Sequence, residues 1–200
     1  HYLDEVLSDN LGTELLAFTG GEPFLNPNMI NILDESLKRG FEVLVLTNAY
    51  RVLKRHESNL LELKELYGDK LHLRVSLDHF TKDLHEGERG TGTFDKTLKR
   101  IKWLVDEKFN VSIAGRSLAH ENEPEVGYQK LLDERNISLK LVNGKNIVIF
   151  PEMHADEDVP EITTKCWDIL NKSPDDQMCA SERMIVKRKG ADRPVAFSYT

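Results

Sequence analysis

The sequence predicts an α/β protein in which parallel strands build an open sheet or an incomplete (β/α) barrel. Short apolar runs alternate with segments of helical periodicity between residues 15 and 150. Each run ends in glycine or polar residues, and the connections are long enough to cross between parallel strands. The length of 200 residues and the 40% hydrophobic content allow one sizeable core.

The first strand is predicted at residues 15–19, and it leads into the turn Gly20-Gly21-Glu22-Pro23. Adjacent glycines permit positive φ and a close approach of the backbone to a ligand. The turn also has a plainer interpretation, as an ordinary strand-to-helix connection. A helix is expected next, capped by Asn26 with Pro27 at its first position and ending before Gly40.

The strand predicted at residues 71–78 alternates strictly between apolar and polar side chains. Alternate residues of a strand point to opposite faces of a sheet. The apolar side chains are expected to meet helices, and the polar ones to line an interior or a cleft. An antiparallel strand with one wet face is the alternative, but the βαβα order favours the barrel. The polar set is His72, Arg74, Ser76 and Asp78.

The remaining predicted elements continue the alternation of strands and helices. Strands are predicted at residues 41–46, 111–115 and 146–150, and helices at residues 58–67, 94–107 and 125–134. Residues 80–92 are predicted as a long polar connection on the same edge as the Gly20-Gly21 turn. Residues 154–200 form a separate extension, with a short helix that begins near Asp158 and a hairpin of strands 183–188 and 194–198. The predicted domains are therefore 1–153 and 154–200.

Composition limits the partners. A net charge of −7 opposes general nucleic-acid binding, and no apolar run approaches the length of a membrane span. The two cysteines, Cys166 and Cys179, suit a reducing cytoplasm. We expect a cytoplasmic protein without nucleic-acid or membrane partners. The chain starts within a predicted helix and ends at a predicted strand, so we expect it to be a piece of a longer protein.

The polar strand ends resemble a known family. Thr19-Gly20-Gly21-Glu22-Pro23 resembles the Gly-Gly-Glu-Pro motif of radical S-adenosylmethionine (SAM) enzymes, and Thr47-Asn48 resembles the end of their third strand. Residues 75–78, followed by Arg89-Gly90 and Phe94-Asp95, resemble the fourth strand and the segment after it. The resemblance covers residues 15–151 and implies a partial (β/α) barrel of the radical SAM type.

The resemblance implies roles for the strand-end residues. Gly20, Gly21 and Glu22 correspond to the groups that hold the ammonium of SAM, and Ser76 to the residue that reaches its ribose or carboxylate. Arg116 is a candidate to pair with the cofactor carboxylate, because a planar guanidinium group can donate two hydrogen bonds to that anion. Glu22→Ala is expected to weaken SAM binding with little loss of fold. The predicted cofactor-binding set is Gly20, Gly21, Glu22, Pro23, Thr47, Asn48, Ser76, Asp78 and Arg116.

Three further side chains have two interpretations each. Asp78, His85 and Arg89 are candidates to touch either cofactor or substrate, and the alternative for each is a rim hydrogen bond or a surface charge. For Glu22 the corresponding alternative is electrostatic stabilisation of a helix start.

Cysteines mark the main departure from the family. Its Cys-x-x-x-Cys-x-x-Cys triplet holds a [4Fe–4S] cluster, but no cysteine precedes residue 15 here. We expect the cluster ligands upstream of His1 and no activity from this chain alone. Cys166 and Cys179 resemble the cysteine-bearing extension of a radical SAM subgroup and are candidate ligands of an auxiliary cluster, or else buried small hydrophobic residues. Tyr199 stands where that subgroup has a further cysteine.

The resemblance implies an enzyme in the intact protein. Reduction of SAM at the [4Fe–4S] cluster would yield a 5′-deoxyadenosyl radical that abstracts hydrogen from an unknown substrate, a small molecule or a peptide. A flavodoxin or ferredoxin is the expected reductant. The alternative is a non-catalytic SAM-binding subunit or scaffold of the same fold.

Overall fold

The structure is a computed structural model that describes residues 2–8, 12–118, 121–152, 163–176, 182–188 and 190–197. By its internal contacts the chain divides into two compact units, His1–Met153 and His154–Thr200.

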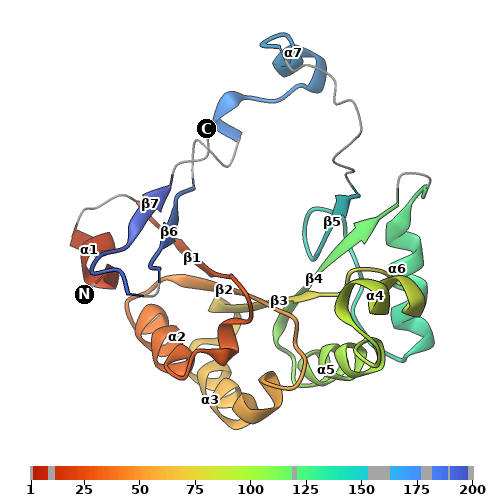
Figure 1. The fold of residues 1–200 in the computed structure, drawn as a ribbon, viewed down its shortest axis with the longest axis horizontal. Helices are drawn as coiled ribbons and strands as arrows, with labels where there is room; N and C mark the ends of the chain where they lie inside the picture. The colour runs from red at the N-terminus through yellow and green to blue at the C-terminus, as the bar shows by residue number, and fades with distance from the viewer. Residues whose placement is uncertain are drawn as a thin grey trace. The chain divides into compact units, whose positions relative to one another are not determined.

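The first unit is built on a five-stranded parallel sheet whose spatial order equals the chain order. Figure 1 shows that the sheet curls like part of a barrel wall, with the helices of this unit on its convex side. The predicted α/β architecture of parallel strands is therefore confirmed. The strands are β1 (Leu15–Phe18), β2 (Glu42–Thr47), β3 (Leu71–Ser76), β4 (Asn110–Ser117) and β5 (Ile147–Pro151).

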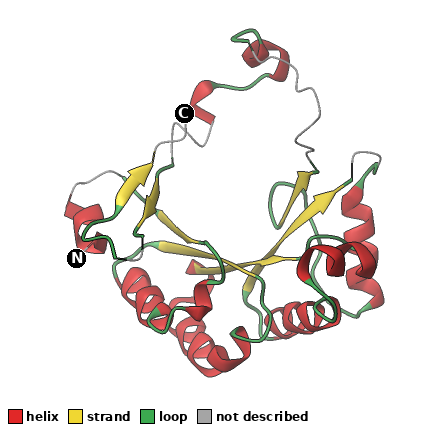
Figure 2. Ribbon diagram, viewed as in Figure 1, coloured by secondary structure: helices red, strands yellow, loops and turns green. Residues whose placement is uncertain are grey.

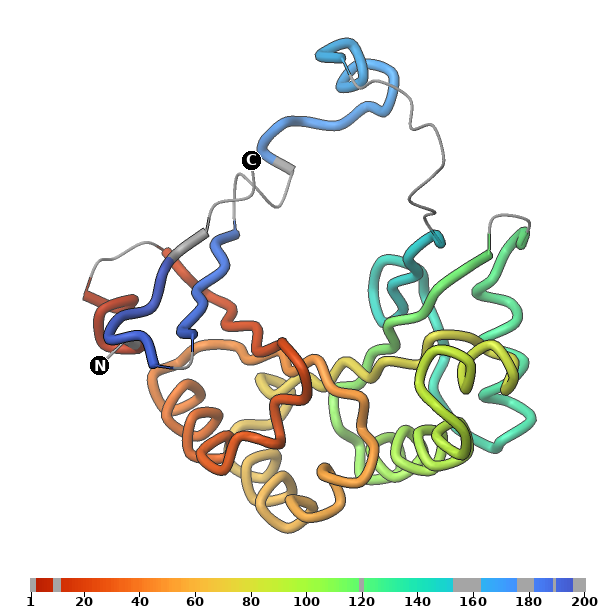
Figure 3. Tube along the Cα trace, viewed as in Figure 1, coloured from red at the N-terminus to blue at the C-terminus, as the bar shows by residue number. Residues whose placement is uncertain are grey.

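Helices connect the strands, and Figures 2 and 3 show how the chain passes from each strand into a helix and returns to the next strand. The helices of this unit are α1 (Tyr2–Ser8), α2 (Met29–Lys38), α3 (Glu57–Tyr67), α4 (Lys82–Arg89), α5 (Phe94–Asp106) and α6 (Pro124–Glu134). Three 3₁₀ turns accompany them: η1 (Pro23–Leu25), η2 (Leu53–His56) and η3 (Gly68–Lys70). Helices α2, α3 and α5 return to the sheet through short turns at the amino ends of the strands.

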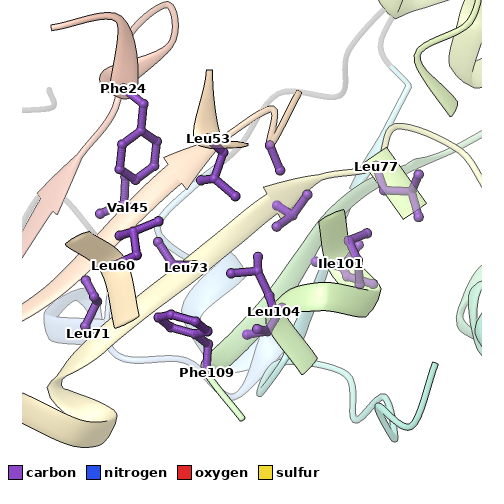
Figure 4. Close-up of a cluster of buried hydrophobic side chains, with 14 of the residues drawn as sticks. Phe24, Val45, Leu53, Leu60, Leu71, Leu73, Leu77, Ile101, Leu104 and Phe109 are labelled. Carbon is purple, nitrogen blue, oxygen red and sulfur yellow. The ribbon is translucent and has the colours of Figure 1, made fainter. Parts of the chain in front are cut away.

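The core lies between the convex face of the sheet and these helices. Figure 4 shows Leu71, Leu73 and Leu77 beside Leu60 of α3 and side chains of α5. Burial alternates along β3, since the odd-numbered residues are buried and the even-numbered ones are half-buried. The predicted two-faced character of this strand is confirmed, and its polar residues lie on the concave face, opposite the core.

Two local predictions are wrong. Residues 80–92 contain α4, whose one buried residue is His85, so the segment has no apolar stripe to reveal a helix. The helix expected at Asn26 begins instead at Met29, after the turn η1. The Asn26 side chain accepts a hydrogen bond from the Asn28 N–H at 3.0 Å, which holds these residues in an Asx turn.

The second unit contains α7 (Cys166–Leu170), the 3₁₀ turn η4 (Pro174–Asp176) and the antiparallel hairpin of β6 (Met184–Val186) and β7 (Val195–Phe197). The predicted hairpin is confirmed. The expected start of a helix near Asp158 lies outside the described residues. Among the helices in the described ranges, none has the length and apolar character needed to cross a membrane.

Candidate functional site

The turn after β1 is open on its outer side. Gly20 and Gly21 have φ values of +91° and +55°, a region that side chains with a Cβ rarely adopt. A Cβ built on either glycine would meet no atom within 4 Å. The glycines are therefore required by backbone conformation and not by crowding within the chain, and the turn remains accessible to a ligand.

Hydrogen bonds to the Glu22 carboxylate connect the turn after β1 to the end of β2. Its Oε1 accepts hydrogen bonds from the Thr47 hydroxyl at 2.8 Å and from the Phe24 N–H at 3.2 Å. Its Oε2 accepts from the Asn48 N–H at 2.8 Å. A carboxylate has about four acceptor sites, so one site on Oε2 is left. These bonds join two strand ends, so Glu22 also has a structural role, and the effect of Glu22→Ala on the fold stays a prediction.

Thr47, the last residue of β2, and Asn48, the residue after it, support this carboxylate. Thr47 is buried, and its hydroxyl oxygen also accepts from the Ala49 N–H at 3.0 Å. The Asn48 Oδ1 accepts from the Tyr50 N–H at 2.9 Å, which turns the chain away from the sheet. The structure thus places Thr47 beneath Glu22 as a support, whereas the half-buried Asn48 lies at the open rim.

A second group of charges lies at the ends of β3 and β4. Arg89 donates to both carboxylate oxygens of Asp78, at 2.5 and 3.0 Å, and this pairing raises the pKa of Arg89. Arg116 pairs with Glu88 at 3.0 Å, and both of these side chains are about half exposed. An exposed pair is weak, so a ligand carboxylate can replace Glu88 at Arg116. Asp78 is less exposed than Glu88 and accepts two hydrogen bonds from Arg89, so its side chain is held more firmly.

Ser76 is the last residue of β3 and lies on the concave face, half-buried. The same face is reached by Arg116 on the neighbouring strand, because Ser76 pairs in register with Ala114, two residues before Arg116. The sheet therefore brings Ser76 and Arg116 to one rim, the same edge of the sheet at which β1 and β2 end before Glu22 and Asn48.

Tyr128 of α6 is a site support that sequence reasoning missed. Its buried hydroxyl accepts from the Arg116 N–H at 3.0 Å and lies within bonding distance of the carbonyl oxygens of Asp78 and Arg116. Burial raises the pKa of Tyr128 well above its ordinary value. Gly115 makes room for the ring, since a Cβ there would lie 2.4 Å from the Tyr128 hydroxyl. A glycine inside a predicted strand was the one available signal.

His85 does not face a ligand. Its side chain is buried within the first unit, next to Phe94, and its Nδ1 accepts from the Asp78 N–H at 3.2 Å. Burial lowers the pKa of His85, which keeps the ring neutral and able to accept this bond. His85 was a candidate either for ligand contact or for a hydrogen bond at the rim. The structure favours the hydrogen bond, which the buried ring makes to the backbone of Asp78.

This burial predicts a pH dependence of stability. In the unfolded chain His85 takes up a proton near its ordinary pKa of 6.5, whereas the folded form resists protonation. The unfolded state therefore binds more protons below this pH, so the melting temperature should fall as the pH drops from about 7.5 to about 5.5. His72, whose pKa burial also lowers, adds to the slope.

Differential scanning calorimetry of wild type and His85→Asn measures this effect. The Asn Oδ1 can still accept from the Asp78 N–H but does not titrate, so the slope should be clearly smaller in the variant. His56→Asn, at a half-exposed position, is the comparison variant that removes a histidine other than a buried one. An unchanged slope in His85→Asn would contradict the assignment.

The described residues do not supply an iron–sulfur site. Cys166, in the second unit, is a free, half-buried thiol, and Cys179 lies outside the described residues. Within the described ranges, no group of three His, Cys, Asp or Glu side chains could hold a metal ion. The rim, in contrast, carries an ordered carboxylate at Glu22 and a half-exposed arginine at Arg116, groups that can bind an ammonium and a carboxylate.

Comparisons with known proteins find relatives of this chain. AlbA, the antilisterial bacteriocin subtilosin biosynthesis protein of Bacillus subtilis (strain 168), is 40% identical over 111 residues, which are 55% of this chain and 24% of AlbA. The AdoMet-dependent heme synthase of Methanosarcina barkeri (strain Fusaro / DSM 804) is 29% identical over 123 residues, 59% of this chain and 33% of that protein. The matches thus span about a quarter and a third of these relatives.

The crystal structure of Streptococcus suis SuiB is similar at a TM-score of 0.49 and 14% identity, over 78% of this chain and 34% of SuiB. The family model of the Radical SAM superfamily matches residues 2–134, well over half of the chain. Enzymes of this family use SAM and a [4Fe–4S] cluster. The chain belongs to the radical SAM superfamily.

Proposed function

We propose that residues 1–153 bind SAM in a radical SAM enzyme. The observation that carries this proposal is the Glu22 carboxylate, which three donors from two strand ends hold in place and which keeps one acceptor site. An ammonium group beside an ordered carboxylate forms a charge-assisted hydrogen bond. The open turn at Gly20 and Gly21 adds backbone groups to the same place.

The remaining rim residues take the other parts of the cofactor. Arg116 exchanges Glu88 for the carboxylate of SAM, and Ser76 donates to that carboxylate or to the ribose. Pro23 and Thr47 are buried and support the rim, Asn48 offers its amide there, and Asp78 fixes Arg89. Preorganised donors of this kind bind without reorganisation. The protein's contribution is to bind, orient and exclude water.

With a [4Fe–4S] cluster, SAM held by Glu22, Ser76 and Arg116 would supply the radical chemistry for hydrogen abstraction from a substrate. We place the cluster thiolates upstream of His1, so residues 1–200 alone would not cleave SAM. Cys166 and Cys179 are proposed as ligands of an auxiliary cluster only. A flavodoxin or ferredoxin would supply the electron.

The proposed substrate is a precursor peptide. AlbA, which shares 40% identity with this chain over the matched residues, is named for the biosynthesis of a bacteriocin. The heme synthase, at 29% identity, represents the alternative of a small-molecule substrate.

The test uses the full-length protein, purified without oxygen and reconstituted with iron and sulfide. With dithionite and SAM, we expect a broad iron–sulfur absorption band and the release of 5′-deoxyadenosine, measured by liquid chromatography. Protein without reconstitution is the control and should release none. SAM binding without the absorption band and without 5′-deoxyadenosine would contradict catalysis and support the non-catalytic subunit instead.

A further inference from the structure

The concave face of β3 carries a second polar feature, further from the rim. Arg74 lies two residues before Ser76 on the same face, and its Nε donates to the Ser112 hydroxyl of β4 at 3.1 Å. Arg74 pairs in register with Ser112 on one side and with Leu46 of β2 on the other. His72 comes one step earlier on this face. These polar side chains thus lie on two neighbouring strands, β3 and β4, with apolar residues of β2 beside them.

Among the described residues, no carboxylate pairs with this arginine. Other arginines with partly buried side chains are paired: Arg39 with Asp4 and Glu35, Arg89 with Asp78, and Arg100 with Glu57. Arg74 has no carboxylate within 4 Å in the described part of the chain, and its bond to Ser112 uses only Nε. Its two terminal NH₂ groups are thus available to a planar anion.

His72 adds a second unsatisfied group. Its Nε2 is buried and has no hydrogen-bond partner among the described residues. Burial lowers the pKa of both His72 and Arg74, and the neighbouring guanidinium lowers that of His72 further. A partly buried cation without a counter-charge is unfavourable, and a bound anion relieves this cost. The site is therefore incomplete as the described chain stands.

We propose that Arg74, with Ser112 and His72, forms a carboxylate-binding subsite on the concave face, and that it takes an acidic group of the substrate. The planar fork of arginine matches a carboxylate through two parallel hydrogen bonds. Leu44 and Leu46 of β2, which pair with His72 and Arg74, make one side of the subsite apolar. An acidic amino-acid side chain, with its methylene groups and its carboxylate, fits this combination. The inference rests on the proposed function and refines its substrate class.

The test compares two nearly isosteric probes by isothermal titration calorimetry of the full-length protein, with and without SAM. N-acetylglutamate amide carries the carboxylate, and N-acetylglutamine amide is its neutral counterpart. We expect wild type to bind the glutamate probe about tenfold more tightly than the glutamine probe. Arg74→Gln should remove this preference, and Arg74→Lys should keep part of it because the charge remains but the fork is lost.

Controls separate the possible outcomes. Arg55→Gln, at an exposed position of η2, should keep the full preference, and SAM should bind Arg74→Gln as well as wild type. Equal affinity for the two probes in wild type, or a preference that survives in Arg74→Gln, overturns the inference. A loss of SAM binding in Arg74→Gln also overturns it, because the anion would then be the carboxylate of SAM. Failure of wild type to bind SAM would instead count against the proposed function.

Discussion

Replacing Gly115 with alanine is expected to lower the free energy of unfolding by about 3 kcal/mol, the upper part of the range for overpacked cores. The new Cβ would lie 2.4 Å from the Tyr128 hydroxyl and 2.5 Å from Cζ of its ring. Tyr128 is fully buried and hydrogen-bonded to the ends of β3 and β4, so its ring has no free space to enter. Strand β4 or helix α6 would have to move.

Urea denaturation of the full-length protein, followed by circular dichroism, measures this loss. Gly87→Ala is the matched control, because Gly87 lies within α4 and a Cβ there meets no atom within 4 Å. Alanine is the better helix former, so this control should be neutral or slightly stabilising. A Gly115→Ala protein as stable as wild type would contradict the packing of Tyr128 against β4.

Replacing Glu22 with alanine should have two effects at once. The Thr47 hydroxyl and the N–H groups of Phe24 and Asn48 lose their shared acceptor, which should cost about 2 kcal/mol of unfolding free energy. SAM affinity should fall at least about tenfold, because the partner of its ammonium is gone. Isothermal titration with SAM and urea denaturation measure the two effects separately.

Glu22→Gln helps to separate these effects. The amide oxygen of glutamine can still accept from the Thr47 hydroxyl. Its NH₂ group would then face the Asn48 N–H or the ligand and cannot accept a hydrogen bond from either. SAM affinity should therefore fall by a larger factor than the stability of the fold. Glu62→Ala, on the exposed face of α3, is the control and should change neither quantity. Wild-type SAM affinity in Glu22→Ala would show that another group holds the ammonium.

The fold could be predicted because its signals are local. The alternation along β3 and the glycines that follow strands and helices depend on neighbouring residues, and they define the faces and ends of elements. The parallel order then brings Glu22, Ser76 and Arg116 to one rim without further information. Helix α4 could not be predicted in this way, because its one buried residue is the polar His85.

The contacts within the rim were less predictable, because they join residues far apart in the chain. The Tyr128 hydroxyl reaches Asp78 across 50 positions, and no sequence pattern links the two residues. The pairing of Asp78 with Arg89 likewise depends on the path of α4, a helix that was not expected. The residue types at strand ends indicate that a site exists, whereas packing decides which of them are supports and which remain available.

The short turns at the amino ends of the strands offer positions for labels and tethers. Asp69 and Glu107 are exposed residues just before β3 and β4, at the opposite ends of these strands from Asp78 and Arg116. A cysteine at either position could carry a fluorophore or a surface linker without entering the rim. Single-molecule fluorescence or immobilised binding assays can therefore be attached to the chain where they leave its ligand-facing edge untouched.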